Sequence, residues 1–317
     1  MDDRASNSMK SKRVTVTRRG LLSSVAGLSL APWFGVAAAD QQAMITREIP
    51  KSGERIPSVG MGTWITFNVG GSEALRRQRL DVLRTFFELG GGMIDSSPMY
   101  GTSQEVIGWC LKRIDNAQRL FSATKVWTPY GSSAESQMDE ATTLWAIDRF
   151  DLMQIHNLVD WEAHLETLLR AKEDGRIRYI GVTTSHGSRH GEMARIIRDQ
   201  PVDFVQFTYN ILDREAEARL LPLAQERRLG VIINRPFRRG HLFKLFQHKP
   251  LPTWAAEFDC RNWAQFFLKF ILSHPAVTCA IPATSQVAHM RENMGALYGR
   301  LPDPEMRRRM VRTVEEL

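Results

Sequence analysis

The sequence predicts an α/β protein, a (β/α)8 TIM barrel with a short N-terminal β-hairpin. Apolar runs of four to seven residues alternate along the chain with amphipathic stretches of ten to twenty residues. Eight such pairs fit within about 240 residues, which is the usual size of this barrel. No Gly-x-Gly-x-x-Gly follows the first run, which disfavours the alternative of an open doubly wound sheet.

The predicted hairpin comes first. Met44–Ile49 and Arg55–Val59 flank a Lys-Ser-Gly turn, a pattern typical of two short antiparallel strands. The eight barrel strands are then predicted at Ser58–Thr63, Gly92–Asp95, Leu120–Lys125, Leu152–His156, Tyr179–Thr183, Phe204–Thr208, Val231–Arg235 and Val277–Ile281.

Helices are predicted between the strands. Their ranges are Glu73–Leu89, Ser103–Arg113, Ser136–Phe150, Trp161–Asp174, Arg189–Asp199, Arg214–Arg228, Asn262–Ser273 and Val287–Tyr298. Nearly continuous apolar strands that are each followed by a helix indicate a parallel sheet covered by helices. The stretch Arg238–Arg261 is longer than an ordinary loop, and long loops often act as lids or clamps over a site.

The charge of the chain lies mostly at its start. The formal net charge is +7, and residues 1–39 contribute +4 of it, from six basic and two acidic residues. The remaining excess is small and has no basic stripe with interleaved aromatic residues, so we expect no nucleic-acid partner. The three cysteines, Cys110, Cys260 and Cys279, are too few and too scattered for a disulfide framework, and we expect no metal site.

Residues 1–39 resemble a twin-arginine export signal. Arg18-Arg19 precedes a moderately apolar run, and a small-residue cleavage site ends at Ala39. An uncleaved membrane span is the alternative, but Pro32 and several Gly and Ser residues interrupt the run. We therefore expect export by the twin-arginine machinery to the periplasm or beyond, no stable membrane span after cleavage, and a barrel domain over residues 40–317.

Polar residues stand at the ends of the predicted strands, where a TIM barrel carries its chemistry. These residues are Asp95, Lys125, His156, Thr183, Gln206 and Arg235, and Tyr100 follows on the short loop after Asp95. A neighbouring ammonium would lower the pKa of the phenol, a carboxylate would hold that ammonium charged, and an imidazole could donate to the same oxygen. Such a set can protonate an alkoxide while it forms, as hydride reduction of a carbonyl requires. The structural alternative is a buried Asp95–Lys125 ion pair beside a core histidine.

Five collinear motifs resemble the aldo/keto reductases. They are Gly62-Thr63-Trp64, Asp95-Ser-Ser-Pro-Met-Tyr100-Gly101, Ala123-Thr-Lys125, Leu152-Met-Gln-Ile-His156 and Gln206-Phe-Thr-Tyr209-Asn210. The resemblance covers about residues 45–300. It implies an NAD(P)H-dependent oxidoreductase that reduces an aldehyde or ketone, a small carbonyl substrate, and the catalytic tetrad Asp95, Tyr100, Lys125 and His156, with Tyr100 as proton donor.

The same resemblance implies NADPH across the barrel mouth. Gln206 would hold the nicotinamide carboxamide, Tyr209 would stack on the nicotinamide ring, and the loop from Arg235 to Leu242 would wrap the pyrophosphate. The implied cofactor residues are Gly62, Thr63, Trp64, Thr183, Gln206, Tyr209, Pro236, Phe237, Arg238, Gly240, Leu242, Ile281, Ala283, Thr284, Ser285, Gln286, His289 and Asn293.

Two departures from the family pattern bear on the cofactor. Thr184 lacks the amide that the family commonly directs at the nicotinamide. Ala283 and Gln286 stand where many members carry the cation that grips the 2′-phosphate, so NAD is a further candidate cofactor unless a lid arginine such as Arg238 substitutes. The alternative function is a regulatory or sensor protein that binds the cofactor with little turnover.

Overall fold

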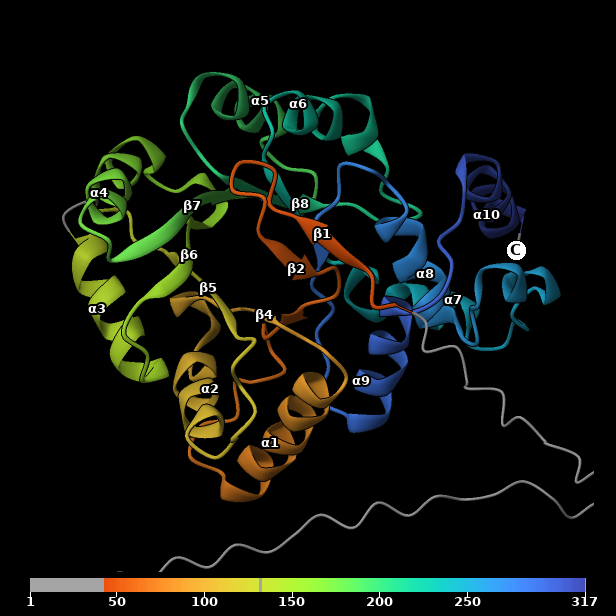
Figure 1. Cartoon of the computed structure of the whole chain (residues 1–317), viewed down its shortest axis with the longest axis horizontal. Helices are drawn as coiled ribbons and strands as arrows, with labels where there is room; N and C mark the ends of the chain where they lie inside the picture. Colours follow the sequence, from red (N-terminus) through yellow and green to blue (C-terminus); the bar gives the residue numbers. More distant parts are fainter. Residues whose placement is uncertain (1–42, 131–132, 317) are drawn as a thin grey trace, which may run out of the picture. The chain divides into compact units, whose positions relative to one another are not determined.

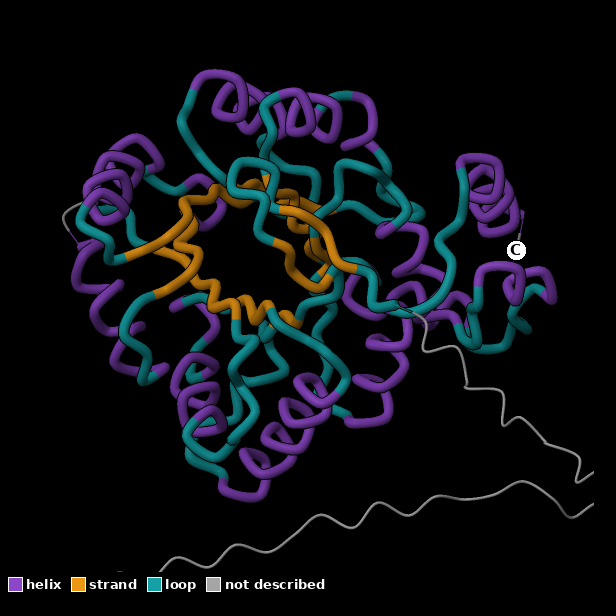
Figure 2. Tube along the Cα trace, in the orientation of Figure 1, coloured by secondary structure: helices purple, strands orange, loops and turns teal. Residues whose placement is uncertain are grey.

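The computed structural model describes residues 43–130 and 133–316. The predicted twin-arginine leader and cleavage site lie outside the described residues. Within the described part a sheet of eight parallel strands forms a barrel, and helices surround it (Figures 1 and 2). The strands are β3 (Met61–Gly62), β4 (Met93–Asp95), β5 (Phe121–Val126), β6 (Phe150–Ile155), β7 (Ile177–Thr183), β8 (Phe204–Thr208), β9 (Gly230–Asn234) and β10 (Cys279–Ala280).

The barrel is closed by its two terminal strands. The strands follow one another in chain order, and each pairs in parallel with the next. Parallel bridges join Val59 to Ala280 and Gly62 to Ala283, so β3 and β10 meet. The predicted (β/α)8 class is therefore confirmed, and the carboxyl ends of all eight strands gather at one mouth.

The predicted helices form with shifted ends, and the described part contains helices that the sequence did not predict. The α-helices are α1 (Glu73–Glu88), α2 (Ser103–Leu111), α3 (Ala134–Trp145), α4 (Trp161–Glu173), α5 (His190–Asp199), α6 (Leu220–Glu226), α7 (His241–Phe246), α8 (Trp263–Leu272), α9 (Val287–Met294) and α10 (Pro304–Glu316). The expected helix Ser136–Phe150 ends early, because Ala146 adopts φ 55° and Phe150 already belongs to β6. Part of the long loop 238–261 is itself helical, as α7.

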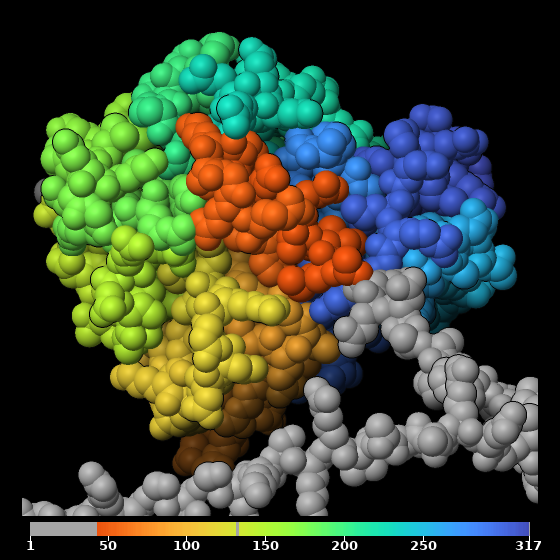
Figure 3. All heavy atoms as spheres, viewed as in Figure 1, coloured from red at the N-terminus to blue at the C-terminus, as the bar shows by residue number. Residues whose placement is uncertain are grey.

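The N-terminal hairpin covers one end of the barrel. Its strands are β1 (Thr46–Glu48) and β2 (Arg55–Pro57), and they pair antiparallel as predicted. In Figure 3 these residues fill the centre of the visible face. Ile49 and Ile56 join the apolar side chains that fill the barrel interior, among them Phe121 and Phe204. The hairpin therefore completes the inner core at the end opposite the strand carboxyl termini.

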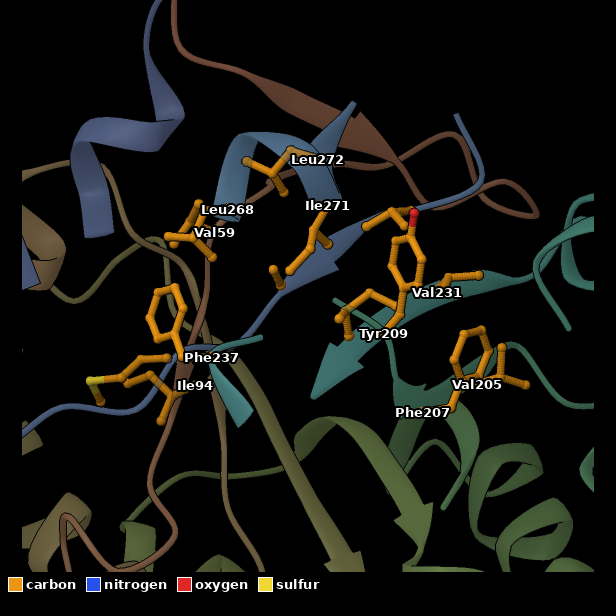
Figure 4. Close-up of a cluster of buried hydrophobic side chains, with 14 of the residues drawn as sticks. Val59, Ile94, Val205, Phe207, Tyr209, Val231, Phe237, Leu268, Ile271 and Leu272 are labelled. Atoms are coloured by element: carbon orange, nitrogen blue, oxygen red, sulfur yellow. The ribbon is translucent and has the colours of Figure 1, made fainter. Parts of the chain in front are cut away.

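A second core lies between the barrel and its helices. Along β8, Val205 and Phe207 point outward into this core with Tyr209, while Phe204 and Gln206 point into the barrel. In Figure 4 Tyr209 lies between Val231 and Ile271, and Val205 and Phe207 lie together below Val231. This alternation is the period of two that a strand imposes on its side chains.

Helix α8 is buried along nearly its whole length, from Ala264 to Leu272. Helix α10, which the sequence did not predict, lies beside it, because Arg307 donates to the carbonyl of Phe270 and to Ser273 Oγ. Within the described residues, no helix combines the length and the apolar character that crossing a bilayer requires.

Candidate active site

A pocket of about 540 Å³ opens at the carboxyl ends of the strands. This volume lies in the usual range for small-molecule sites. Its lining residues come from nearly every strand end: Gly62, Thr63, Trp64, Ile65, Thr66, Asp95, Met99, Tyr100, His156, Asn157, Thr183, Ser185, His186, Gln206, Asn234, Arg235, Pro236, Phe237, Arg239, Gly240, Phe243, Ile281, Ala283, Thr284, Ser285 and His289.

A buried ion pair forms the floor of this pocket. Lys125 Nζ donates to Asp95 Oδ2 at 2.5 Å and to the carbonyl of Ser96 at 2.7 Å. Asp95 Oδ1 accepts from the amides of Gln154 at 2.8 Å and Gln206 at 3.0 Å. Each carboxylate oxygen is thus satisfied, which is the condition for keeping a charge inside a protein.

Tyr100 stands above this pair on the 3-10 helix η1 (Pro98–Tyr100). The Lys125 ammonium lies 5.2 Å from the centre of its ring and directs its hydrogen bonds to Asp95 and Ser96. Burial, and then the Asp95 charge, raise the pKa of the Tyr100 phenol. Burial therefore outweighs the lowering of this pKa that was expected from Lys125. The phenol is held protonated.

His156 follows β6 directly and faces Tyr100. The two ring centroids are 5.6 Å apart and the planes cross at 86°. Burial, together with the Lys125 charge, lowers the pKa of His156 to about 3, so the imidazole is neutral near neutral pH. A neutral imidazole carries one N–H and can donate one hydrogen bond into the pocket.

The opposite wall is cationic. Arg235 and Arg239 line the pocket, and the Arg239 guanidinium lies 4.1 Å from the centre of the Trp64 ring. Arg235 Nε is buried without a hydrogen-bond partner in the described chain, and burial and the Arg239 charge lower the pKa of Arg235. Such a wall suits an anionic ligand.

Backbone strain concentrates around the same pocket. Ile65, Asn157, His186, Arg235 and Arg239 all line it and all have positive φ, between 51° and 64°. Positive φ is costly for residues other than glycine and tends to cluster at functional sites. Among the described residues, no three His, Cys, Asp or Glu side chains lie together in a way that could hold a metal ion.

Comparison with known proteins places the chain in a family. The family model described as "Aldo/keto reductase family" matches residues 58–310. The chain belongs to the aldo/keto reductase family.

Individual relatives are distant and cover most of the chain. It is 25% identical over 256 residues to methylglyoxal reductase YeaE of Escherichia coli, a match that covers 79% of this chain and 89% of the relative. It is 28% identical over 299 residues to L-glyceraldehyde 3-phosphate reductase of the same species, covering 78% and 86%. The structure of an aldo/keto reductase from Klebsiella pneumoniae in complex with NADP and acetate matches with a TM-score of 0.71 at 23% identity, covering 83% and 93% of the two chains.

Most residues that the aldo/keto reductase motifs predicted for the site lie on the pocket. Asp95, Tyr100 and His156 line it, and Lys125 lies directly beneath, 0% exposed at its side chain. The cofactor candidates on the wall are Gly62, Thr63, Trp64, Thr183, Gln206, Pro236, Phe237, Gly240, Ile281, Ala283, Thr284, Ser285 and His289.

Five cofactor candidates of the family pattern do not line the pocket. Tyr209 is fully buried on the outer side of β8, where its hydroxyl meets Glu217 and Arg307, so the expected stacking on a nicotinamide does not fit this structure. Arg238 is held at 3.0 Å by the Asp213 carboxylate. The others are Leu242 and Asn293, which are buried, and Gln286, which is absent from the lining.

The sequence did not single out other residues of this aldo/keto reductase site. Gln154 touches the Asp95 carboxylate, Asn234 donates to Gln206 Oε1 at 3.3 Å, and Ser97 Oγ lies 2.8 Å from His156 Nδ1. Gln154 could have been predicted from the strand period. It lies two residues before His156, on the same face of the strand, and a buried polar side chain there needs a hydrogen-bond partner. Arg239 lies in the segment Arg235 to Leu242 that the resemblance assigned to the pyrophosphate, whereas no sequence signal placed His186.

Proposed function

We propose that this protein reduces a small aldehyde or ketone to the alcohol, with NADPH as hydride donor and Tyr100 as proton donor. The observation that carries the proposal is that Tyr100 and His156 face each other at one pocket, above the buried Lys125–Asp95 pair. The names of the two Escherichia coli relatives, which are reductases of small aldehydes, support this substrate class.

The pocket residues fit a nicotinamide dinucleotide. Arg235 and Arg239 offer cations to a pyrophosphate or phosphate, and the buried Arg235 Nε has an unused N–H. At Gly62, the last residue of β3, a Cβ would lie 2.9 Å from the carbonyl oxygen of Ile281, so β3 and the segment after β10 approach each other closely at the mouth. The NADP complex of the Klebsiella neighbour supports the same ligand. When bound, the cofactor would supply the hydride.

The chain's own residues would then handle the proton. Tyr100 would donate its phenolic proton to the carbonyl oxygen as negative charge develops there, and His156 would donate a second hydrogen bond to that oxygen. A raised phenol pKa suits this role, because the phenol stays protonated until a stronger base, the nascent alkoxide, forms beside it. Lys125 would stabilise the resulting phenolate, and Asp95 would keep Lys125 in place.

Discrimination between NADPH and NADH would depend on the loop arginines. Ala283 lines the pocket without a charge, Gln286 is not among the lining residues, and Arg238 forms an ion pair with Asp213. We therefore propose Arg235 and Arg239, which line the pocket, in place of Arg238 as the cations that would hold the 2′-phosphate. We expect weaker discrimination than a dedicated lysine or arginine at position 283 would give.

One titration tests the function. The purified protein is titrated with NADPH and with NADH while tryptophan fluorescence is followed, and a panel of small aldehydes is then added while the cofactor absorbance is recorded. Multiple turnovers with at least one aldehyde support the proposal. Tight cofactor binding with slow hydride transfer and very slow release would instead support the sensor alternative.

We also propose that the protein is exported by the twin-arginine route and acts outside the cytoplasm. The support is the sequence alone: Arg18-Arg19, the diluted apolar run and the small residues before Asp40. Replacing Arg18-Arg19 by Lys-Lys should leave the protein in the cytoplasm with its leader attached. Unchanged export of this double variant, measured by cell fractionation, would contradict this route.

A further inference from the structure

Ser97 lies between the two groups that face the reacting carbonyl. It is fully buried at the start of η1, and its Oγ accepts a hydrogen bond at 3.2 Å from the backbone N–H of Met99. The same Oγ lies 2.8 Å from Nδ1 of His156. One hydroxyl therefore caps the turn that carries Tyr100 and also contacts the imidazole opposite.

The hydrogen count at Ser97 decides the direction of this contact. A serine hydroxyl has one hydrogen to donate and two lone pairs. The Met99 N–H occupies one lone pair, and His156 Nδ1 is the partner within the described chain that can accept the hydroxyl hydrogen. If Nδ1 carried the proton instead, Ser97 would accept twice and its buried hydrogen would have no acceptor, which is costly.

The proton of His156 must then be on its other nitrogen. Burial and the Lys125 ammonium keep this imidazole neutral, so it has a single N–H. When Nδ1 accepts from Ser97, that N–H is at Nε2. His156 lines the pocket, and its Nε2 makes no hydrogen bond to the described protein.

We propose that Ser97 is a positioning residue that fixes His156 in the Nε2–H tautomer, so that the imidazole presents a donor to the substrate carbonyl oxygen. The proposal rests on the function proposed above and deepens it. In the opposite tautomer His156 would present a lone pair to an oxygen that is gaining negative charge. The interaction would then be repulsive at the transition state.

The tautomer can be measured without turnover. Protein labelled with ¹⁵N-histidine gives long-range proton–nitrogen spectra in which the pyridine-type nitrogen and the N–H nitrogen of each ring are distinct. The His156→Asn variant identifies the His156 signals by their loss. We expect the wild type to show Nδ1 as the pyridine-type nitrogen; an Nδ1–H ring in the wild type overturns the proposal, whatever the variants do.

Ser97→Ala then tests the cause. We expect the His156 signals to move toward the Nδ1–H form or a mixture, kcat to fall by about tenfold, as for the loss of one hydrogen bond, and the Kd for NADPH to stay unchanged. Ser97→Thr, which keeps a hydroxyl, should restore both the tautomer and kcat. A Ser97→Ala protein that keeps the wild-type tautomer and kcat overturns the proposal.

Ser96→Ala is the matched control for the spectrum. Ser96 is the neighbouring residue and is equally buried, but its Oγ accepts from Thr63 Oγ1 at 2.9 Å and not from the imidazole. This variant should leave the His156 tautomer unchanged, and a shift as large as that of Ser97→Ala would overturn the specific role of Ser97. Absence of reduction in the wild type would overturn the proposed function, while the spectrum would still decide the tautomer.

Discussion

Acid should destabilise this fold through His156. The residue is 6% exposed, and burial together with the Lys125 ammonium lowers its pKa to about 3. An unfolded chain has a histidine pKa of about 6.5. Between these values the unfolded chain binds a proton that the folded protein does not, so the stability is fully present above the unfolded pKa and is lost as the pH falls toward the folded pKa.

The two pKa values set the size of the effect. For one such group, proton linkage lowers the free energy of unfolding by about 2 kcal/mol between about pH 7 and pH 5. His156→Gln removes this contribution, because an amide does not titrate in that range. The substitution has its own cost in the native state, but that cost does not change with pH.

Urea unfolding followed by tryptophan fluorescence measures this difference. The wild type, His156→Gln and the surface control His248→Gln are unfolded near pH 7, 6 and 5. Between the two ends of that range His156→Gln should lose about 2 kcal/mol less than the wild type, and His248→Gln should follow the wild type. Parallel pH curves for the wild type and His156→Gln would refute the reasoning.

Three further outcomes are expected. Tyr100→Phe should slow aldehyde reduction by about 10²–10⁴-fold and leave the affinity for NADPH nearly unchanged. The control Tyr130→Phe, at a residue that is 69% exposed, should reduce the aldehyde at the normal rate. Normal turnover in Tyr100→Phe would refute the proton-donor assignment. Arg235→Gln should weaken NADPH binding, measured by fluorescence titration, by about 1–3 kcal/mol. Arg238→Gln should weaken it less, because Arg238 pairs with Asp213. The reverse order would show that Arg238 binds the phosphate. Gly108→Ala should lower the free energy of unfolding by about 2 kcal/mol or more, because the new Cβ would lie 1.8 Å from the Leu144 carbonyl oxygen. The control Gly191→Ala in α5, which has open space around it, should be neutral or slightly stabilising when both variants are unfolded in urea. Equal effects of the two substitutions would show that α2 and α3 can move apart.

The barrel was predictable because its strands are apolar on both faces. Runs such as Phe204–Thr208 and Val231–Arg235 differ clearly from the amphipathic helices between them, and strand order follows chain order in this fold. Helix α10 was missed because its apolar side chains are few, with Met310 and Val314 as its buried residues. Its position depends on contacts with α8 that no local pattern contains.

The site residues were predictable where their side chains point from a strand into the barrel. Tyr209 comes three positions after Gln206, so a strand that turns Gln206 inward turns Tyr209 outward. Applying this period to the motif would have removed Tyr209 from the site. The contacts of Arg238 and Arg239 could not be predicted from strand periodicity. Both residues have positive φ, and their side chains contact different partners, Asp213 and the Trp64 ring respectively.

The hairpin at the far end of the barrel affects the electrostatics of the site. Its Ile49 and Ile56 fill the barrel interior with apolar side chains at the end away from the pocket, while Asp95 borders the pocket. A ligand that fills the pocket would remove the remaining exposure of Asp95 to solvent. The attraction between the two charges is then screened least when the reaction occurs, and the pair holds its geometry most firmly while the pocket is filled.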